Sequence, residues 1–271
     1  MQLLVAGSDR VDAGKTTFAT GLCSYLEVPG FKPRAGNDFW FDHDDVLASL
    51  AAGRLVGKDA RRLSEAAPDT LTPEQRNPVH RLWTPLGSSR RGLLGQAGRA
   101  FLLDRIGAPP SQQWVLNGTV ERPELVRERL PTDGARVVET VEALNELTRE
   151  LHVPALEQLH ERVRSTADAV VESYADIALP MVGYEPDAVV VVGPRRARIY
   201  DGGRYTTACE IAAGSAREGQ LEETTGSVLE MIEPVETASV PALARDTRGD
   251  PSAVATALEP TYQRLLAAVG S

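Results

Sequence analysis

The first 26 residues constrain this 271-residue chain more than any other stretch. An apolar run over residues 3–6 ends at Gly7, and a polar loop follows it as far as Gly14. The next large apolar residues recur at every fourth position, as Phe18, Leu22 and Leu26. This period places them on one face of a helix. The stretch therefore predicts a buried strand, a glycine-bearing loop and an amphipathic helix, in that order.

The loop has the residue types that bind phosphate groups. Backbone N–H groups at a helix N-terminus meet the charges of a triphosphate with a favourable dipole, and Gly14 lets the backbone come close because it has no Cβ. In this interpretation Lys15 reaches the β- and γ-phosphates, and the Thr16 hydroxyl binds Mg²⁺. The predicted nucleotide-binding set is Asp12, Ala13, Gly14, Lys15, Thr16 and Thr17.

The spacing of this loop differs from the common phosphate-loop pattern. Six residues separate Gly7 from Gly14, which is more than the pattern has, so we expect an extra turn before the loop wraps its ligand. A Gly-Lys-Thr-Thr run can also simply open a helix. The strand before it and the amphipathic helix after it favour the phosphate-binding interpretation.

Composition narrows the classes of function. The formal net charge of −9 disfavours a general nucleic-acid binder, whose surface would be basic. No apolar run approaches the ~18 residues of a membrane span, and no signal-like segment precedes the first strand, so we expect a cytoplasmic protein without a membrane partner. Cys23 and Cys209 match no metal or redox spacing, and we expect two reduced thiols that are buried or half-buried.

Strands and helices alternate along the rest of the chain. We expect buried strands at 168–172 and 188–192, a strand at 114–116, helices at 46–52, 136–165 and 253–269, a helical stretch through Leu103, and a hairpin at Asp201-Gly202-Gly203. Pro154 should kink or split the helix that contains it. The pattern predicts a three-layer α/β fold with a mainly parallel sheet flanked by helices. We expect one domain over residues 1–271, with an elaborated helical middle over about 45–165.

Two charged residues lie where parallel strands should end. Glu172 closes one expected strand, at the place where P-loop proteins hold Mg²⁺ directly or through water. A surface carboxylate is the alternative. Lys32 ends another expected strand, which we place next to the phosphate loop in the sheet. The chain has only three lysines, Lys15, Lys32 and Lys58, so a solvated role for Lys32 is a weaker explanation than usual.

The acidic cluster at residues 42–45 allows two interpretations. Asp42, His43 and the two aspartates after them could bind a metal or activate a nucleophile, whereas Asp44 or Asp45 could simply cap the next helix. Arg90 and Arg91 suit a substrate carboxylate or phosphate, although solvated surface arginines are favoured. The resulting site prediction has Lys15, Lys32 and Asp42 as catalytic residues, and Thr16 and Glu172 as metal ligands.

The chain resembles the dethiobiotin synthetase-like branch of P-loop proteins. The residues that carry the resemblance are Gly7-Ser8-Asp9 with Ala13-Gly14-Lys15-Thr16, Lys32-Pro33 with Gly36, Asn77-Pro78 with Pro85-Leu86, and Val171-Glu172 with Leu179-Pro180. The resemblance implies a P-loop NTPase fold, ATP and Mg²⁺ as cofactors, lysines that contact phosphates and a carbamate-forming substrate, a glutamate that binds Mg²⁺, and a homodimer. Ser173-Tyr174-Ala175 replaces the glycine-rich turn of the family.

We therefore expect an ATP- and Mg²⁺-dependent enzyme that activates a small-molecule acceptor with the γ-phosphate. One alternative is a nucleotide-dependent switch or scaffold ATPase, with the helices at 136–165 as the surface for a protein partner. Another is a polynucleotide 5′-kinase, because residues 12–17 also resemble the loop of that family. The acidic charge balance weighs against this last alternative.

Overall fold

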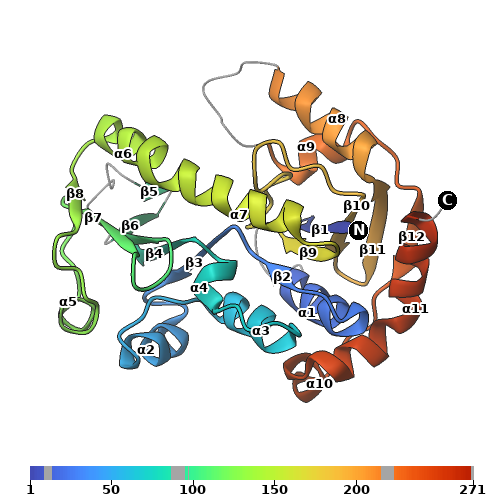
Figure 1. Cartoon of the computed structure of the whole chain (residues 1–271), viewed down its shortest axis with the longest axis horizontal. Coiled ribbons are helices and arrows are strands. Elements are labelled where there is room, and N and C mark those ends of the chain that lie inside the picture. Colours follow the sequence, from blue (N-terminus) through green and yellow to red (C-terminus); the bar gives the residue numbers. More distant parts are fainter. Residues whose placement is uncertain (9–13, 87–94, 97, 215–222, 270–271) are drawn as a thin grey trace. The chain divides into compact units, whose positions relative to one another are not determined.

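The chain forms two compact units, each of which contains a β-sheet (Figure 1). The computed structural model describes residues 1–8, 14–86, 95–96, 98–214 and 223–269. Unit 1 comprises Met1–Pro33, Arg62–Leu71 and His160–Ser271, and unit 2 comprises Arg34–Arg61 and Thr72–Leu159. The single domain expected over residues 1–271 stays a prediction, and within it the chain forms these two units.

Unit 1 is built on a six-stranded sheet within the described residues, in the order β12-β11-β10-β1-β9-β2. Its strands are β1 (Gln2–Gly7), β2 (Gly30–Phe31), β9 (Ala169–Glu172), β10 (Ala188–Gly193), β11 (Arg196–Asp201) and β12 (Glu236–Ser239). The four strands from β10 to β2 run parallel, and β11 and β12 join them through antiparallel pairs. The strands expected at 168–172 and 188–192 are confirmed as β9 and β10, which are buried along their whole length.

Helices cover both faces of the unit 1 sheet (Figure 1). On one face, α1 (Lys15–Leu26) and α11 (Pro251–Val269) share a core with Val190 and Ile199, and the rings of Phe18 and Tyr262 lie 5.0 Å apart. On the other face lies α8 (Gly202–Gly214), because successive strand residues point to opposite sides and the α8 residue Tyr205 packs 5.9 Å from Tyr200. The shorter helices of this unit are α9 (Thr225–Leu229) and α10 (Arg245–Gly249).

Unit 2 contains a second sheet, in the order β3-β4-β6-β7-β8 within the described residues, with β5 paired to β6. Its strands are β3 (Arg34–Asp38), β4 (Val79–Pro85), β5 (Gly95–Gln96), β6 (Arg99–Ile106), β7 (Gln113–Asn117) and β8 (Arg136–Val138). Its helices are α2 (His43–Ala51), α4 (Pro73–Arg76), α5 (Glu124–Arg129) and α6 (Val141–Leu147), while α3 (Lys58–Ala66) and α7 (Val153–Ser165) start in unit 2 and end in unit 1.

Both sheets are mixed, and the prediction of a mainly parallel sheet holds for unit 1, where three of the five described strand pairs are parallel, but not for unit 2. In unit 2, β3–β4 and β7–β8 are parallel pairs, whereas β4–β6 and β6–β7 are antiparallel. The strand expected at 114–116 is confirmed as β7. The helical stretch expected through Leu103 is wrong, because these residues form the strand β6. The predicted helical middle therefore contains a sheet.

The chain around Gly202 differs from the prediction. The hairpin predicted at Asp201-Gly202-Gly203 is wrong: β10 and β11 are joined through Arg195, at φ +64°, and α8 begins at Gly202. A Cβ on Gly202 would lie 1.7 Å from the Pro186 carbonyl oxygen, so this glycine permits a close approach of two backbones.

The helix break expected at Pro154 is confirmed. A π-helix, η1 (Thr148–His152), separates α6 from α7, and the Val153 N–H donates to the Thr148 carbonyl five residues before it. Proline has no N–H to continue a regular ladder. The first residues of the expected 136–165 helix form β8 instead. None of the helices in the described ranges has the length and apolar character that a bilayer span requires.

Candidate functional site

Charged side chains meet at the carboxyl ends of β9 and β2 in unit 1. Glu172, the last residue of β9, accepts a hydrogen bond from the Thr16 hydroxyl at 2.6 Å through Oε1. The same oxygen lies 2.6 Å from Lys32 Nζ, and the side chains of Lys32 and Glu172 are only 4% and 0% exposed. Three residues predicted from the sequence, Thr16, Lys32 and Glu172, therefore form one cluster, in which Lys32 and Glu172 are buried and Thr16 is half-buried.

The position of Lys32 in the sheet differs from the prediction. Its strand β2 pairs with β9, so β9 lies between β2 and the phosphate-loop strand β1. Neighbouring strands are ~4.8 Å apart, and the long lysine side chain spans the distance to Glu172 on the adjacent strand. The expected place next to the phosphate loop is wrong, but Lys32 still reaches a residue that contacts Thr16.

The N-terminus of α1 is arranged as an anion-binding helix start would be. Gly14 precedes it with φ +82° and ψ 10°, a left-handed conformation that glycine adopts without steric cost. A Cβ at this position would meet only ordinary contact, 4.0 Å from Val192 Cγ1, so conformation rather than space favours the glycine. The first turn of α1 contains no acidic residue. Its positive dipole end is therefore not offset by a carboxylate from that turn.

Lys15 contacts the turn that follows β9. Its Nζ donates to the Ala175 carbonyl oxygen at 2.6 Å, and Lys15 is mostly buried. The turn is closed by Ser173, whose hydroxyl donates to the Ile177 carbonyl at 2.5 Å, and Ala175 has a positive φ of 48°. Sequence reasoning missed this contact, because the acceptor is a backbone carbonyl and no residue type marks it.

The same turn is attached to α9. The Asp176 carbonyl accepts hydrogen bonds from the Thr225 N–H at 2.6 Å and from the Thr225 hydroxyl at 3.0 Å. Thr225 is completely buried, and the Ala178 N–H donates to the Glu223 carbonyl at 2.9 Å. The carbonyl that holds Lys15 therefore lies in a segment fixed on both sides, by β9 and by α9.

Several predicted residues are not part of the Thr16–Lys32–Glu172 cluster. Asp12, Ala13, Arg90 and Arg91 lie outside the described residues. Thr17 belongs to the first turn of α1, and its hydroxyl lies at the long distance of 3.5 Å from Arg62 Nη1. Its contact with a phosphate stays a prediction.

Asp42 belongs to unit 2, where it precedes α2. Its Oδ2 accepts a hydrogen bond from the Asp38 N–H at 2.8 Å, and its catalytic role stays a prediction. The expectation that Asp44 or Asp45 caps α2 is wrong, because the helix begins at His43. Asp45 instead forms an ion pair with Arg61. Across the described part of the chain, no three His, Cys, Asp or Glu side chains gather as metal ligands.

The residues of the cluster fit a magnesium-bound phosphate in kind and number. Magnesium keeps several waters and uses one or two protein oxygens beside substrate phosphates, and Thr16 Oγ1 and Glu172 Oε1 are two such oxygens in contact. Lys32 already neutralises Glu172. A metal ion at this carboxylate would therefore share it with the ammonium group or bind it through water.

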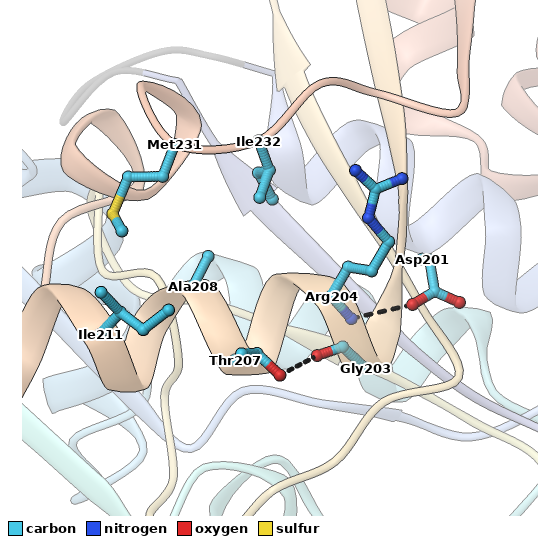
Figure 2. A pocket seen from close by; sticks show the side chains of 8 residues that line it. All are labelled: Asp201, Gly203, Arg204, Thr207, Ala208, Ile211, Met231 and Ile232. Carbon is cyan, nitrogen blue, oxygen red and sulfur yellow. Dashed lines mark hydrogen bonds between the residues drawn. The ribbon is translucent and has the colours of Figure 1, made fainter.

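A pocket of about 510 Å³ lies elsewhere in unit 1, against α8 (Figure 2). It is lined by Asp201, Gly203, Arg204, Thr207, Ala208, Ile211, Met231 and Ile232. Figure 2 shows Asp201 and Arg204 at one end and the apolar side chains of Ile211 and Met231 at the other. None of the cluster residues lines this pocket, so we base the function on the cluster and not on the cavity.

Comparison with known proteins finds no family model and no curated sequence that matches the chain.

Proposed function

We propose that the protein is an ATP- and Mg²⁺-dependent enzyme of the dethiobiotin synthetase-like branch of P-loop proteins. In this proposal it activates a small-molecule acceptor with the γ-phosphate. The observation that carries the proposal is the convergence of Thr16 and Lys32 on Glu172, directly behind the helix start that Gly14 and Lys15 form. Phosphoryl transfer needs these types of group in one place, because catalysis rests on positioning and charge neutralisation.

Each residue then has a distinct task. The N–H groups at the start of α1 and the Lys15 ammonium bind the phosphates. Thr16 and Glu172 would hold Mg²⁺, which would supply neutralisation of the phosphate charge when bound. Lys32, with its ammonium next to Glu172, orients the acceptor and offsets the negative charge that develops on it.

In this proposal, the Lys15 ammonium turns from a backbone carbonyl to a phosphate when the nucleotide binds. The ammonium donates to the Ala175 carbonyl, and contact with a phosphate replaces this hydrogen bond. A charge-assisted bond to phosphate is stronger than one to a neutral carbonyl. The exchange is therefore favourable, and it removes one contact that holds the turn after β9.

That exchange also favours a second candidate, a nucleotide-dependent switch that acts through a protein partner. Loss of the Lys15 contact affects a turn that Thr225 ties to α9, so a change at the phosphates would reach a second element. The two candidates differ in what stimulates ATP consumption. An enzyme responds to a small acceptor, and a switch responds to a partner protein.

Thermal unfolding with Mg²⁺ and either ATP or GTP tests nucleotide binding. Ligand at ~100 times its dissociation constant adds about 2.7 kcal/mol, which should raise the midpoint by roughly 5–10 °C for a chain of this size. Lys15→Ala should abolish this shift. Lys58→Ala is the matched control, because Lys58 is an exposed lysine outside the cluster. The proposal fails if neither nucleotide shifts the midpoint, or if Lys15→Ala responds as the wild type does.

Turnover then separates the two candidates. ADP release should depend on an acceptor from a panel of small carboxylic acids and amines, and Lys32→Met should abolish this acceptor-dependent release while the nucleotide-induced shift of the midpoint persists. Slow ATP hydrolysis that no acceptor stimulates would favour the switch.

A further inference from the structure

Unit 2 exposes two large aromatic side chains at one turn. Trp40 is 72% exposed and Phe41 is 80% exposed, whereas Trp83 and Trp114 are each only 5% exposed. Aromatic rings bury much apolar area when they are covered. Adjacent exposed rings of this size are typical of interaction sites.

The turn holds these rings on a fixed backbone. Asp38 is buried, and its Oδ1 accepts hydrogen bonds from the N–H groups of Trp40 at 2.9 Å and Phe41 at 3.1 Å. The Asp38 N–H in turn donates a hydrogen bond to Asp42 Oδ2. Little further ordering of the backbone is then needed on binding, and ordering is one of the main costs of association.

An exposed helix face follows the turn along the chain. Leu47 is exposed, as are Ala48 and Ala51, and their spacing from Asp44 places all four on one side of α2. The opposite side of α2 packs in the core of unit 2 through Val46 and Leu50. The outward side of this short helix is therefore an apolar stripe with a carboxylate at its start.

The charged side chains of the turn and of the start of α2 are carboxylates, of which Asp45 is paired with Arg61. Residues 37–48 contain Asp38, Asp42, Asp44 and Asp45, and no lysine or arginine. Asp42 and Asp44 are exposed. An indole face attracts a cation, and it attracts guanidinium in particular because the planar group stacks on the ring while donating to nearby carboxylates.

We propose that Trp40, Phe41, Asp42, Asp44 and Leu47 form a docking surface for an arginine-bearing amphipathic segment of a partner protein. Arginine of the partner stacks on Trp40 and pairs with the carboxylates, and apolar residues of the partner cover Phe41 and Leu47. Exposed tryptophan that meets arginine is a frequent combination at interface hot spots. The proposal concerns the surface of unit 2 and is independent of the phosphate chemistry of unit 1.

The test measures binding of a fluorescein-labelled synthetic amphipathic peptide, with arginine on one face and leucine on the other, to the full chain by fluorescence polarisation. The double variant Trp40→Ala/Phe41→Ala should raise the dissociation constant at least about tenfold, because it removes the stacking partner and the covered apolar area. Its net charge equals that of the wild type, so general attraction of a basic peptide to an acidic protein is unchanged. Asp44→Asn should weaken binding by about two- to threefold.

Two controls accompany the test. Val182→Ala removes an apolar side chain that is 98% exposed in unit 1, and it should leave the dissociation constant unchanged. A twin peptide with glutamate in place of arginine should not bind. The rings are exposed, so the double variant should keep the circular dichroism spectrum and the unfolding midpoint of the wild type.

Several results would overturn the proposal. The arginine peptide could fail to bind, the double variant could bind it as tightly as the wild type, or the glutamate twin could bind equally well. Light scattering gives a further result that would overturn the proposal. If the wild type is a dimer and the double variant is a monomer, a second copy of the chain occupies the surface.

Discussion

The two units bury charged side chains in different places. In unit 1 the apolar parallel strands are followed by charge at their carboxyl ends, as with Glu172 on β9 and Lys32 after β2. In unit 2 charge lies within the strands, as with Arg81 on β4 and Asp104 and Arg105 on β6. Ligands of α/β sheets bind beyond the carboxyl ends of strands. The first arrangement can therefore meet a ligand, whereas the second is enclosed by its own sheet.

The charges of unit 2 have fixed protein partners on several sides. Asp104 accepts two hydrogen bonds from Arg81, both at 2.6 Å, and His152 Nε2 lies 3.2 Å from Asp104 Oδ2. Burial by itself raises the pKa of Asp104, but the charge and hydrogen bonds of Arg81, together with His152, outweigh it and hold the pKa well below its usual range. Arg105 donates to the carbonyls of Leu55 and Asn77. These contacts tie β4, β6 and η1 together.

The contacts of unit 1 include one that a ligand can replace. The Lys15 ammonium donates to a neutral carbonyl at Ala175, and an anion would attract it more strongly. No comparable exchange is available to Asp104, whose partners are themselves buried or held by neighbouring strands. In this chain, the buried charge of unit 1 with a neutral carbonyl partner is therefore a better candidate for ligand binding than the buried ion pair of unit 2.

The largest effect should come from removing the fixed charge of unit 2. Asp104→Ala leaves Arg81 and His152 without their carboxylate, and breaking a buried pair costs about 3–5 kcal/mol of unfolding free energy. Urea unfolding followed by tryptophan fluorescence measures the loss. All three tryptophans of the chain lie in unit 2, so this signal reports that unit.

Asp44→Ala is the control for this variant, because Asp44 is an exposed aspartate in the same unit, and it should change the free energy by less than about 0.5 kcal/mol. The folded-state pKa of Asp104 is lowered, so its contribution is fully present above its unfolded pKa of ~3.9 and is lost as the pH falls below that value. The decline of stability in acid should therefore be shallower in Asp104→Ala. Equal losses in the two variants would show that the Asp104 contacts do not hold unit 2.

The difference between apolar strands and strands that contain charge explains which strands the sequence could predict. The continuous apolar runs of β9 and β10 identify buried strands directly, and the predictions for both are confirmed. The apolar run of the strand β6 covers only residues 100–103, between Arg99 and Asp104, and so short a run does not distinguish a buried strand from a buried helix. The charges of β6 are compensated by residues far away in sequence, such as His152, which no local pattern can show.

The contacts of the candidate site likewise divide into those that local sequence features predict and those that depend on distant residues. The spacing of Gly14, Lys15 and Thr16 and the strand end at Glu172 are local features, and they led to the residues that the structure brings together. The contact of Lys15 with Ala175 uses a backbone carbonyl 160 residues away. It depends on the pairing of β1 with β9, which the sequence does not specify.

A second, smaller effect should separate the Lys32–Glu172 pair of unit 1 from the fixed Arg81–Asp104 pair of unit 2. Lys32→Met leaves the buried Glu172 carboxylate without its ammonium partner, and Mg²⁺ can then compensate that charge. Magnesium at about ten times its dissociation constant should return roughly 1.4 kcal/mol of unfolding free energy to this variant. Chemical unfolding of Lys32→Met with and without Mg²⁺, in the absence of nucleotide, measures the recovery.

The control is Asp104→Ala, in which Mg²⁺ should restore nothing, because the charges left behind in unit 2 are cationic. The double variant Lys32→Met/Glu172→Gln should also lose the response, since the carboxylate is gone. If Mg²⁺ stabilises all three variants equally, the ion acts on the general surface charge and not at Glu172.

The smallest effect concerns the two thiols. Their labelling reports on unit 1, as tryptophan fluorescence reports on unit 2. Cys23 and Cys209 both lie in unit 1 and are buried, and burial raises the pKa of Cys209 to about 12. Far below a pKa, the thiolate fraction increases tenfold for each pH unit. In the variant Cys23→Ala, labelling of Cys209 by a thiol reagent in native buffer should therefore keep accelerating from pH 8 to pH 10.

A thiol with the ordinary pKa of ~8.5 would behave differently, because its rate would level off about one unit above that value. Such a plateau would mean that α8 opens, so that Cys209 reacts from an exposed state.

The linked change in stability has the opposite sign to that of Asp104. A raised folded-state pKa gives a contribution that is present below ~8.5 and is lost as the pH rises towards about 12. Alkali should thus lower the stability of unit 1 through Cys209, and acid should lower the stability of unit 2 through Asp104. Thiol labelling reports on unit 1 and tryptophan fluorescence reports on unit 2. The two signals, followed across the pH range, determine whether the units unfold separately.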